Sequence, residues 1–165
     1  MRALRGIIVL ILTLVLPAHV SAADFQAGWK AYQRGYYATA WEEWRPLAEQ
    51  GNANAQYYLG VMHQNGEGVP QNYALAALRY FQAAEQGLAS AQKNLGIMYA
   101  RGDGVAQNYV FSHMWLDLAV ARRPPGVTRD EAVNFRDGIA KYMTPAEVAE
   151  AQCLAKQWKP KQPLF

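Results

Sequence analysis

Ser90 and Lys93 are the residues whose types and spacing come nearest to a reactive pair. They form the pattern Ser-x-x-Lys, which places a serine hydroxyl one helical turn from a lysine that could act as its base. Enzymes that react with β-lactams through this pattern also need Ser-Asp-Asn and Lys-Thr-Gly elements. Neither string occurs in the sequence. A catalytic serine is therefore disfavoured, and Ser90 with Lys93 is kept as an alternative.

The side chains that could bind a metal are too few in each place to complete a site. His113 and Asp117 stand four apart, as neighbours on one helix face, but two ligands do not make a zinc site. The segments 66–68 (Gly-Glu-Gly) and 102–104 (Gly-Asp-Gly) each offer one carboxylate, whereas calcium takes about 6–8 oxygens. We expect no metal and no cofactor, and a simple contact pair between His113 and Asp117.

Two copies of one stretch, 36 residues apart, organise the chain. Residues 51–73 read GNANAQYYLGVMHQNGEGVPQNY and residues 87–109 read GLASAQKNLGIMYARGDGVAQNY, identical at 13 of 23 positions without a gap. Repetition at a period of about 20–50 residues is the signature of a solenoid built from helical or strand units. Residues 24–50 look like a degenerate first copy, because Tyr37 falls on the same period as Tyr73 and Tyr109.

Each copy predicts a helix, a short glycine-rich loop and a second helix. In the first full copy Leu59 and Met62 recur at helical spacing, and Gly60 leaves room for a neighbouring helix. Gly66 fits the left-handed position that ends a helix, and Asn72 fits the N-cap of the next one.

Two further helices are predicted after the third copy. Residues 124–126 (Pro-Pro-Gly) predict a loop. Thr128 with Glu131, and Thr144 with Glu147, have the spacing of capping boxes at helix starts. Because this helix pair lacks the glycine-rich loop of the repeats, we expect it to cap the stack.

The predicted fold is therefore all-α: an α/α superhelical solenoid of helix-loop-helix repeats with a C-terminal helical cap. The expected organisation is a signal peptide in residues 1–22, a degenerate first repeat in 24–50, a second repeat in 51–86, a third repeat in 87–122, a C-terminal helix pair in 128–158 and a tail in 159–165. The single cysteine, Cys153, allows no disulfide within this sequence, so we expect packing alone to hold the fold.

The N-terminal residues predict a cleaved secretory signal. A short basic start is followed by an apolar run in residues 7–16 and by small residues that end at Ala22 or Ala23. The run is short for a membrane span, so we expect a periplasmic or secreted protein with no stable span after cleavage. Arg2 and Arg5 would leave with the signal, and 14 basic residues would then face 13 acidic ones. This near-neutral balance disfavours a nucleic-acid partner.

The two full copies share the pattern Ala-Gln-x-x-Leu-Gly-x-Met, then Gly-x-Gly-Val-x-x-Asn-Tyr, and Ala-Glu-Gln-Gly closes the first and second units at residues 48–51 and 84–87. This pattern resembles the Sel1-like repeat, a relative of the tetratricopeptide repeat, over about residues 25–121, and residues 143–152 resemble the tail of secreted bacterial members. His63 departs from the pattern, which has tyrosine there. The resemblance implies a superhelix that scaffolds protein–protein contacts, often in envelope or signalling settings, with first helices that line a concave, partner-binding face.

The two copies differ at two adjacent positions of the first helix. Tyr57 and Tyr58 are replaced by Lys93 and Asn94, a change that a shared core position would rarely tolerate, and exposed aromatic residues are typical of interface anchors. We expect a non-catalytic scaffold of the bacterial envelope that binds a partner protein or peptide. The expected partner-binding residues are Gln56, Tyr57, Tyr58, Gln92, Lys93 and Asn94.

Two alternatives stay open at this point. Some secreted relatives are discussed as β-lactam binders, so the first alternative is a cell-wall or β-lactam-binding or hydrolysing envelope protein that uses Ser90 and Lys93. The second is a purely structural spacer in a larger assembly.

Overall fold

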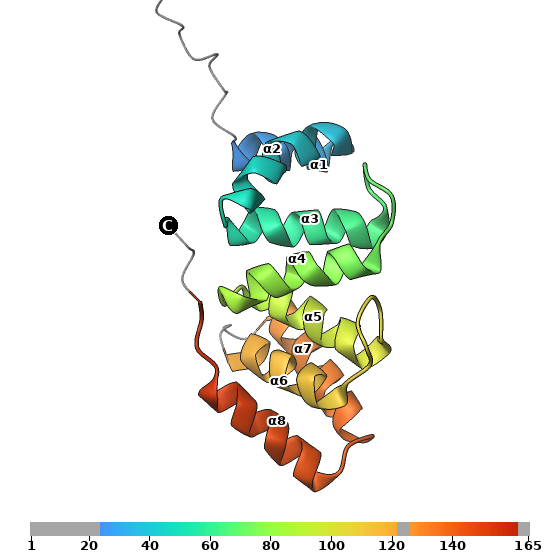
Figure 1. Cartoon of the computed structure of the whole chain (residues 1–165), viewed down its shortest axis with the longest axis vertical. Coiled ribbons are helices and arrows are strands. Elements are labelled where there is room, and N and C mark those ends of the chain that lie inside the picture. Colours follow the sequence, from blue (N-terminus) through green and yellow to red (C-terminus); the bar gives the residue numbers. More distant parts are fainter. Residues whose placement is uncertain (1–23, 122–125, 162–165) are drawn as a thin grey trace, which may run out of the picture.

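The computed structural model describes residues 24–121 and 126–161, and these ranges contain eight α-helices and no strand (Figure 1). The helices stack along one long axis, so the predicted all-α solenoid is confirmed. They are α1 (Phe25–Gln33), α2 (Tyr37–Glu49), α3 (Ala53–Asn65), α4 (Tyr73–Glu85), α5 (Ala89–Arg101), α6 (Tyr109–Ala121), α7 (Val127–Ala140) and α8 (Pro145–Gln157). The signal predicted in residues 1–22 lies outside the described residues.

Local residues set several helix ends where the sequence predicted them. The Asn72 carboxamide accepts a hydrogen bond from the backbone N–H of Leu75 at 3.0 Å and caps α4. Gly66 ends α3 with a φ of 74°, a left-handed conformation that glycine adopts at low cost. Thr144 and Glu147 form the predicted capping box of α8.

The start of α7 differs from the prediction. The helix begins at Val127, with Gly126 as its N-cap, and the Gly126 carbonyl accepts the N–H groups of Arg129 and Asp130 at 2.9 and 3.0 Å. The N-cap of this helix is therefore Gly126, two residues before the predicted Thr128.

A glycine of the first helix packs against a large side chain of the second helix in both full repeats. A Cβ atom added at Gly60 would lie 2.7 Å from the ring of Tyr80, and one added at Gly96 would lie 2.8 Å from Cγ of Leu116. Both partner side chains are completely buried. The predicted close approach at Gly60 is thus part of the core.

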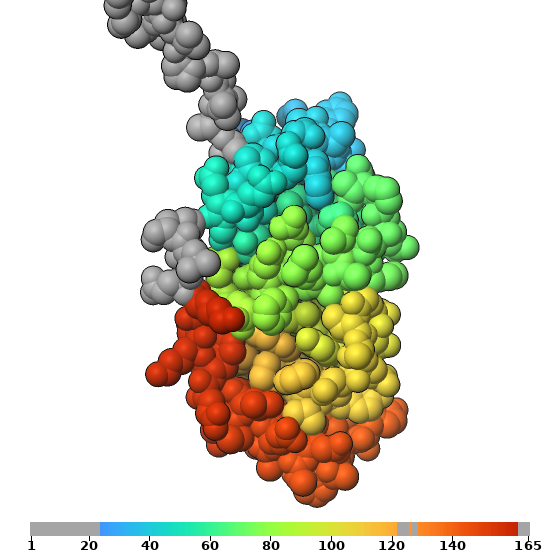
Figure 2. Space-filling view, in the orientation of Figure 1, coloured from blue at the N-terminus to red at the C-terminus, as the bar shows by residue number. Residues whose placement is uncertain are grey.

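The last two helices flank α6, since both pack mainly against it. After α8 the chain returns along the stack to the end of α4 (Figure 1). There the Trp158 indole N–H donates to the Glu85 carboxylate at 3.2 Å, and the Lys161 N–H donates to the Glu85 carbonyl at 2.7 Å. In Figure 2 this C-terminal segment lies directly beside the light green surface of α4.

Within residues 24–121 and 126–161, no helix combines the length and apolar character that crossing a membrane requires.

Candidate functional site

The two glutamines among the predicted partner-binding residues are buried between repeats. Gln56 Nε2 donates to the carbonyl oxygen of Ala48 at 3.1 Å, and Gln92 Nε2 donates to that of Ala84 at 3.2 Å. Both side chains are buried, Gln92 completely. Each amide thus gives a second hydrogen bond to a carbonyl at the end of the preceding second helix, which also accepts the N–H of Gly51 or Gly87, and neither side chain offers surface to a partner.

Tyr58 and Asn94 face the preceding repeat. The Tyr58 ring stacks on Trp44 with a centroid distance of 4.8 Å and lies 5.2 Å from the ring of Trp29; burial among these rings raises the pKa of Tyr58. Asn94 hydrogen-bonds the buried hydroxyl of Tyr80. Both side chains are half-buried, so each presents only an edge to solvent.

Tyr57 and Lys93 lie on the neighbouring positions of the same helices. The Tyr57 ring is 5.1 Å from Tyr58 and 5.6 Å from Tyr80. Lys93 Nζ lies 2.6 Å from Oε2 of Glu131 on α7, and the carboxylate side chain is 48% exposed. Because the Lys93 side chain is only 17% exposed, the first-helix face carries an aromatic ring in one repeat and a partly buried ion pair in the next. Partner binding at Tyr57, Tyr58, Lys93 and Asn94 stays a prediction.

The Ser-x-x-Lys pair lies near the start of α5. Ser90 is half-buried, and the Lys93 ammonium is held by Glu131. Use of Lys93 as a base for Ser90 would first require this ion pair to break.

The His113 and Asp117 pair forms as predicted. Nδ1 of His113 is 3.1 Å from Oδ2 of Asp117, and Nη1 of Arg136 on α7 is 3.1 Å from the other carboxylate oxygen. Asp117 thus joins α6 to α7. Among the described residues no three His, Cys, Asp or Glu side chains gather as a metal site would require, and Cys153 is exposed.

A second surface, which the sequence reasoning missed, lies on α4. Leu75, Leu78 and Phe81 are 41%, 49% and 39% exposed, although large apolar side chains favour burial. We call these three residues, with the exposed Phe111 of α6, the α4 face. The signal was available in the sequence, because the same positions of α2 carry the polar residues Thr39, Glu42 and Arg45.

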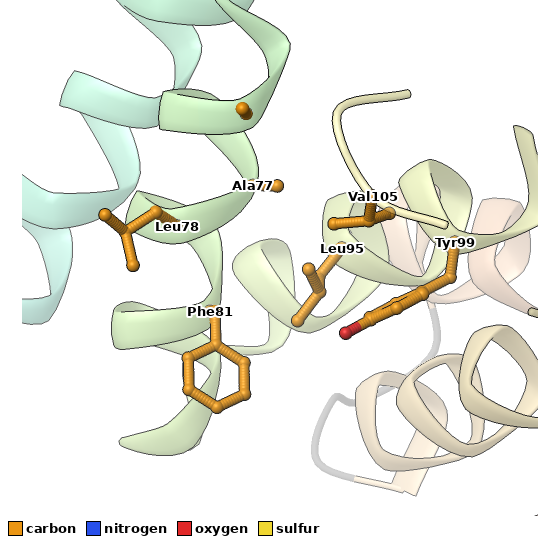
Figure 3. A pocket seen from close by; sticks show the side chains of 7 residues that line it. Ala77, Leu78, Phe81, Leu95, Tyr99 and Val105 are labelled. Atoms are coloured by element: carbon orange, nitrogen blue, oxygen red, sulfur yellow. The ribbon is translucent and has the colours of Figure 1, made fainter. Parts of the chain in front are cut away.

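A shallow hollow of about 240 Å³ opens beside the α4 face. Figure 3 shows Leu78 and Phe81 of α4 on one side, with Leu95 and Tyr99 of α5 and Val105 of the following loop on the other. All of its lining side chains are aliphatic or aromatic, so it suits apolar groups.

Comparison with known proteins identifies the repeats. Residues 53–88 and 89–122 match the family described as Sel1 repeat. The chain contains two Sel1 repeats. The two matched Sel1 repeats contain α3 with α4 and α5 with α6, while α1 and α2 lie before them.

Two solved structures are similar to this Sel1-repeat chain. One is c5321, a protective antigen present in uropathogenic Escherichia coli strains that displays an SLR fold; it is 30% identical, with a TM-score of 0.73 over 79% of this chain. The other is a Sel1 repeat protein from Oxalobacter formigenes, 26% identical, with a TM-score of 0.65 over 82% of this chain. The chain spans 28% and 56% of their respective lengths. No curated protein matches it.

Proposed function

We propose that this Sel1-repeat protein is a non-catalytic scaffold of the bacterial envelope that holds a partner protein or peptide on its concave first-helix face. Sel1-repeat proteins are generally protein–protein interaction scaffolds. The envelope location and the face are the parts proposed for this chain.

The difference between Tyr57 and Lys93 is the observation from which we assign partner binding to the first-helix face. Several first-helix residues that build the fold are the same in both full repeats, including the buried glutamines and the glycines of the helix contacts. Tyr57 and Lys93 occupy one repeat position, yet they differ in size, charge and polarity, and both reach the surface of α3 and α5. Tyr57 packs against Tyr58 and Tyr80, and Lys93 pairs with Glu131. Because the two repeats share neither contact, we assign the difference between Tyr57 and Lys93 to a partner.

The envelope location rests on the N-terminal signal pattern. If the signal is cleaved, protein recovered from expressing cells begins at Ala23 or Asp24. Intact-mass measurement of protein from the envelope fraction tests this. Recovery of the protein in the cytoplasm with Met1 retained would refute the location.

Charge substitution at Lys93 tests the face. The Lys93 side chain is 17% exposed and that of its partner Glu131 is 48% exposed. Because Lys93→Glu places a second carboxylate beside Glu131, circular dichroism first has to show that the variant is folded. Tagged protein from Asp24 onward is cross-linked in an envelope extract, beside Glu42→Lys on α2 as the matched control. We expect one partner to be recovered with wild type and control and lost with Lys93→Glu.

The other outcomes are equally informative. Equal recovery with Lys93→Glu would exclude the first-helix face. If no protein is recovered with any variant, the scaffold proposal itself fails.

A further inference from the structure

The α4 face differs from the equivalent positions, 36 residues apart, of the other two second helices, α2 and α6. At the positions of Leu75, Leu78 and Phe81, α2 carries Thr39, Glu42 and Arg45, and α6 carries Phe111, Met114 and Asp117. The α2 residues are polar and exposed, as suits solvent. On α6 the central residue, Met114, is only 7% exposed. The central residue of α4, Leu78, is as apolar as Met114 but half exposed.

The helix α8 lies over the part of α6 that contains Met114. It packs on α6 and turns Ala151, Leu154, Ala155 and Trp158 toward the core cluster that contains Met114 and Trp115. These four residues have the i, i+3, i+4, i+7 spacing of an amphipathic helix. The protein itself therefore shows how a single amphipathic helix buries this position of a second helix.

The α4 face continues directly from that covered surface. The Phe81 ring lies 6.1 Å from the ring of Trp115, which in turn lies 6.1 Å from Trp158. Lys161 Nζ lies 6.0 Å from the Phe81 ring on the same side. Phe81 is thus held in place by the capped part of the stack, and a rigid apolar wall of this kind lowers the entropic cost of binding.

The exposed area of the α4 face indicates whether a second copy of this chain or a single helix binds there. Each of the four side chains presents about two-fifths of the roughly 200 Å² of a large apolar side chain, so the face offers about 320 Å². A stable dimer needs about 800 Å² from each partner, and two α4 faces pressed together fall well short of it. One amphipathic helix with two or three apolar side chains matches both this area and the 240 Å³ hollow.

We propose that the α4 face and its hollow form a second docking surface, which takes an amphipathic helix of a partner protein in the way that α6 takes α8. This inference rests on the proposed scaffold function and adds both a second surface and the kind of partner segment. The partner segment carries apolar residues at i, i+3 or i+4, and i+7, and one of them enters the hollow between Phe81 and Tyr99.

Site-specific photocross-linking in expressing cells tests the proposal. The full chain carries p-benzoyl-phenylalanine at Leu78, at Glu42 as the equivalent position of α2, or at Asn54 on the exposed side of α3. We expect a cross-link at Leu78, and none at Glu42, to a partner peptide with the stated apolar spacing. A synthetic copy of that peptide should bind about 10- to 100-fold more weakly to Leu78→Glu, and equally well to Glu42→Lys.

Several results would overturn it. One is a cross-link from Leu78 to a second copy of this chain or to the chain's own C-terminal peptide. Others are a cross-link to a partner peptide that lacks the stated apolar spacing, or no more cross-linked product at Leu78 than at Glu42. A partner that cross-links at Asn54 but not at Leu78 overturns this inference and leaves the proposed function standing.

Discussion

At Gly104 an added Cβ atom would clash with the backbone of the preceding repeat, so the structure defines the effect of Gly104→Ala well. A Cβ atom at Gly104 would overlap the carbonyl group of Tyr73 and would lie 2.5 Å from the N of Ala74. These are backbone atoms at the start of α4, so no side-chain rotation can relieve the clash. The loop glycine one repeat earlier, Gly68, is placed in the same way against Tyr37.

Two costs add at this position. The φ of Gly104 is 70°, and a residue with a Cβ atom pays about 1–2 kcal/mol in this left-handed region. Displacing the packed backbone of α4 costs about a further 1–3 kcal/mol. We expect Gly104→Ala to lower the free energy of unfolding by about 3 kcal/mol.

Urea denaturation followed by circular dichroism measures the loss. With a slope of about 2 kcal/mol per M for a domain of this size, the midpoint should fall by about 1.5 M. Gly35→Ala is the matched control, because Gly35 has a φ of 78° and an added Cβ meets nothing within 4 Å. Its cost should be about 1 kcal/mol, or about 0.5 M. Equal midpoints for the two variants would refute the reasoning that close contact between repeats matters.

Three further predictions concern buried and reactive side chains. Gln92→Ala should lower the free energy of unfolding by about 1–3 kcal/mol, because it removes a completely buried side chain and its hydrogen bond to the Ala84 carbonyl, which keeps its bond from the Gly87 N–H; Gln107→Ala, which removes an exposed bond of 2.7 Å, should cost much less in the same urea assay. Burial lowers the pKa of His63 below its usual 6.5, with Arg79 acting in the same direction. The unfolded chain therefore takes up the proton first as the pH falls, so this contribution to stability is full well above pH 6.5 and is lost as the pH falls through and below 6.5. His63→Tyr should flatten this decline in urea titrations across that range, and an equal decline in both proteins would contradict the assignment. A fluorescent penicillin should label wild type no more than it labels Ser90→Ala. Labelling of wild type that is lost in Ser90→Ala would restore the enzymatic alternative.

Most of the fold could be predicted because its signals are local and repeated. Gly66, Asn72 and Thr144 each act within a few residues of their own helix end, so their roles follow from short sequence patterns. The start of α7 could not be placed in this way, because the Gly126 carbonyl competes with Thr128 for the first turn, and the sequence does not rank the two.

The candidate site was harder to predict, because exposure depends on neighbouring repeats. Gln56 and Gln92 are polar and lie on a first helix, yet both are buried because each faces the carbonyl end of the preceding second helix. The α4 face shows the opposite case. Leu78 has the pattern of a core residue, and it is exposed because α8 turns back onto α6 and ends short of it.

By itself the sequence determined the repeat period, the helix-loop-helix unit and the resulting solenoid, since these depend on spacing along the chain and on local capping. Only the tertiary structure decided which of two chemically similar positions is covered. Met114 and Leu78 occupy the same repeat position, and they differ because the path of the C-terminal segment buries one and leaves the other in solvent. That path is set by contacts such as Trp158 with Glu85, 73 residues apart in the chain, and no local pattern encodes a contact at such separation.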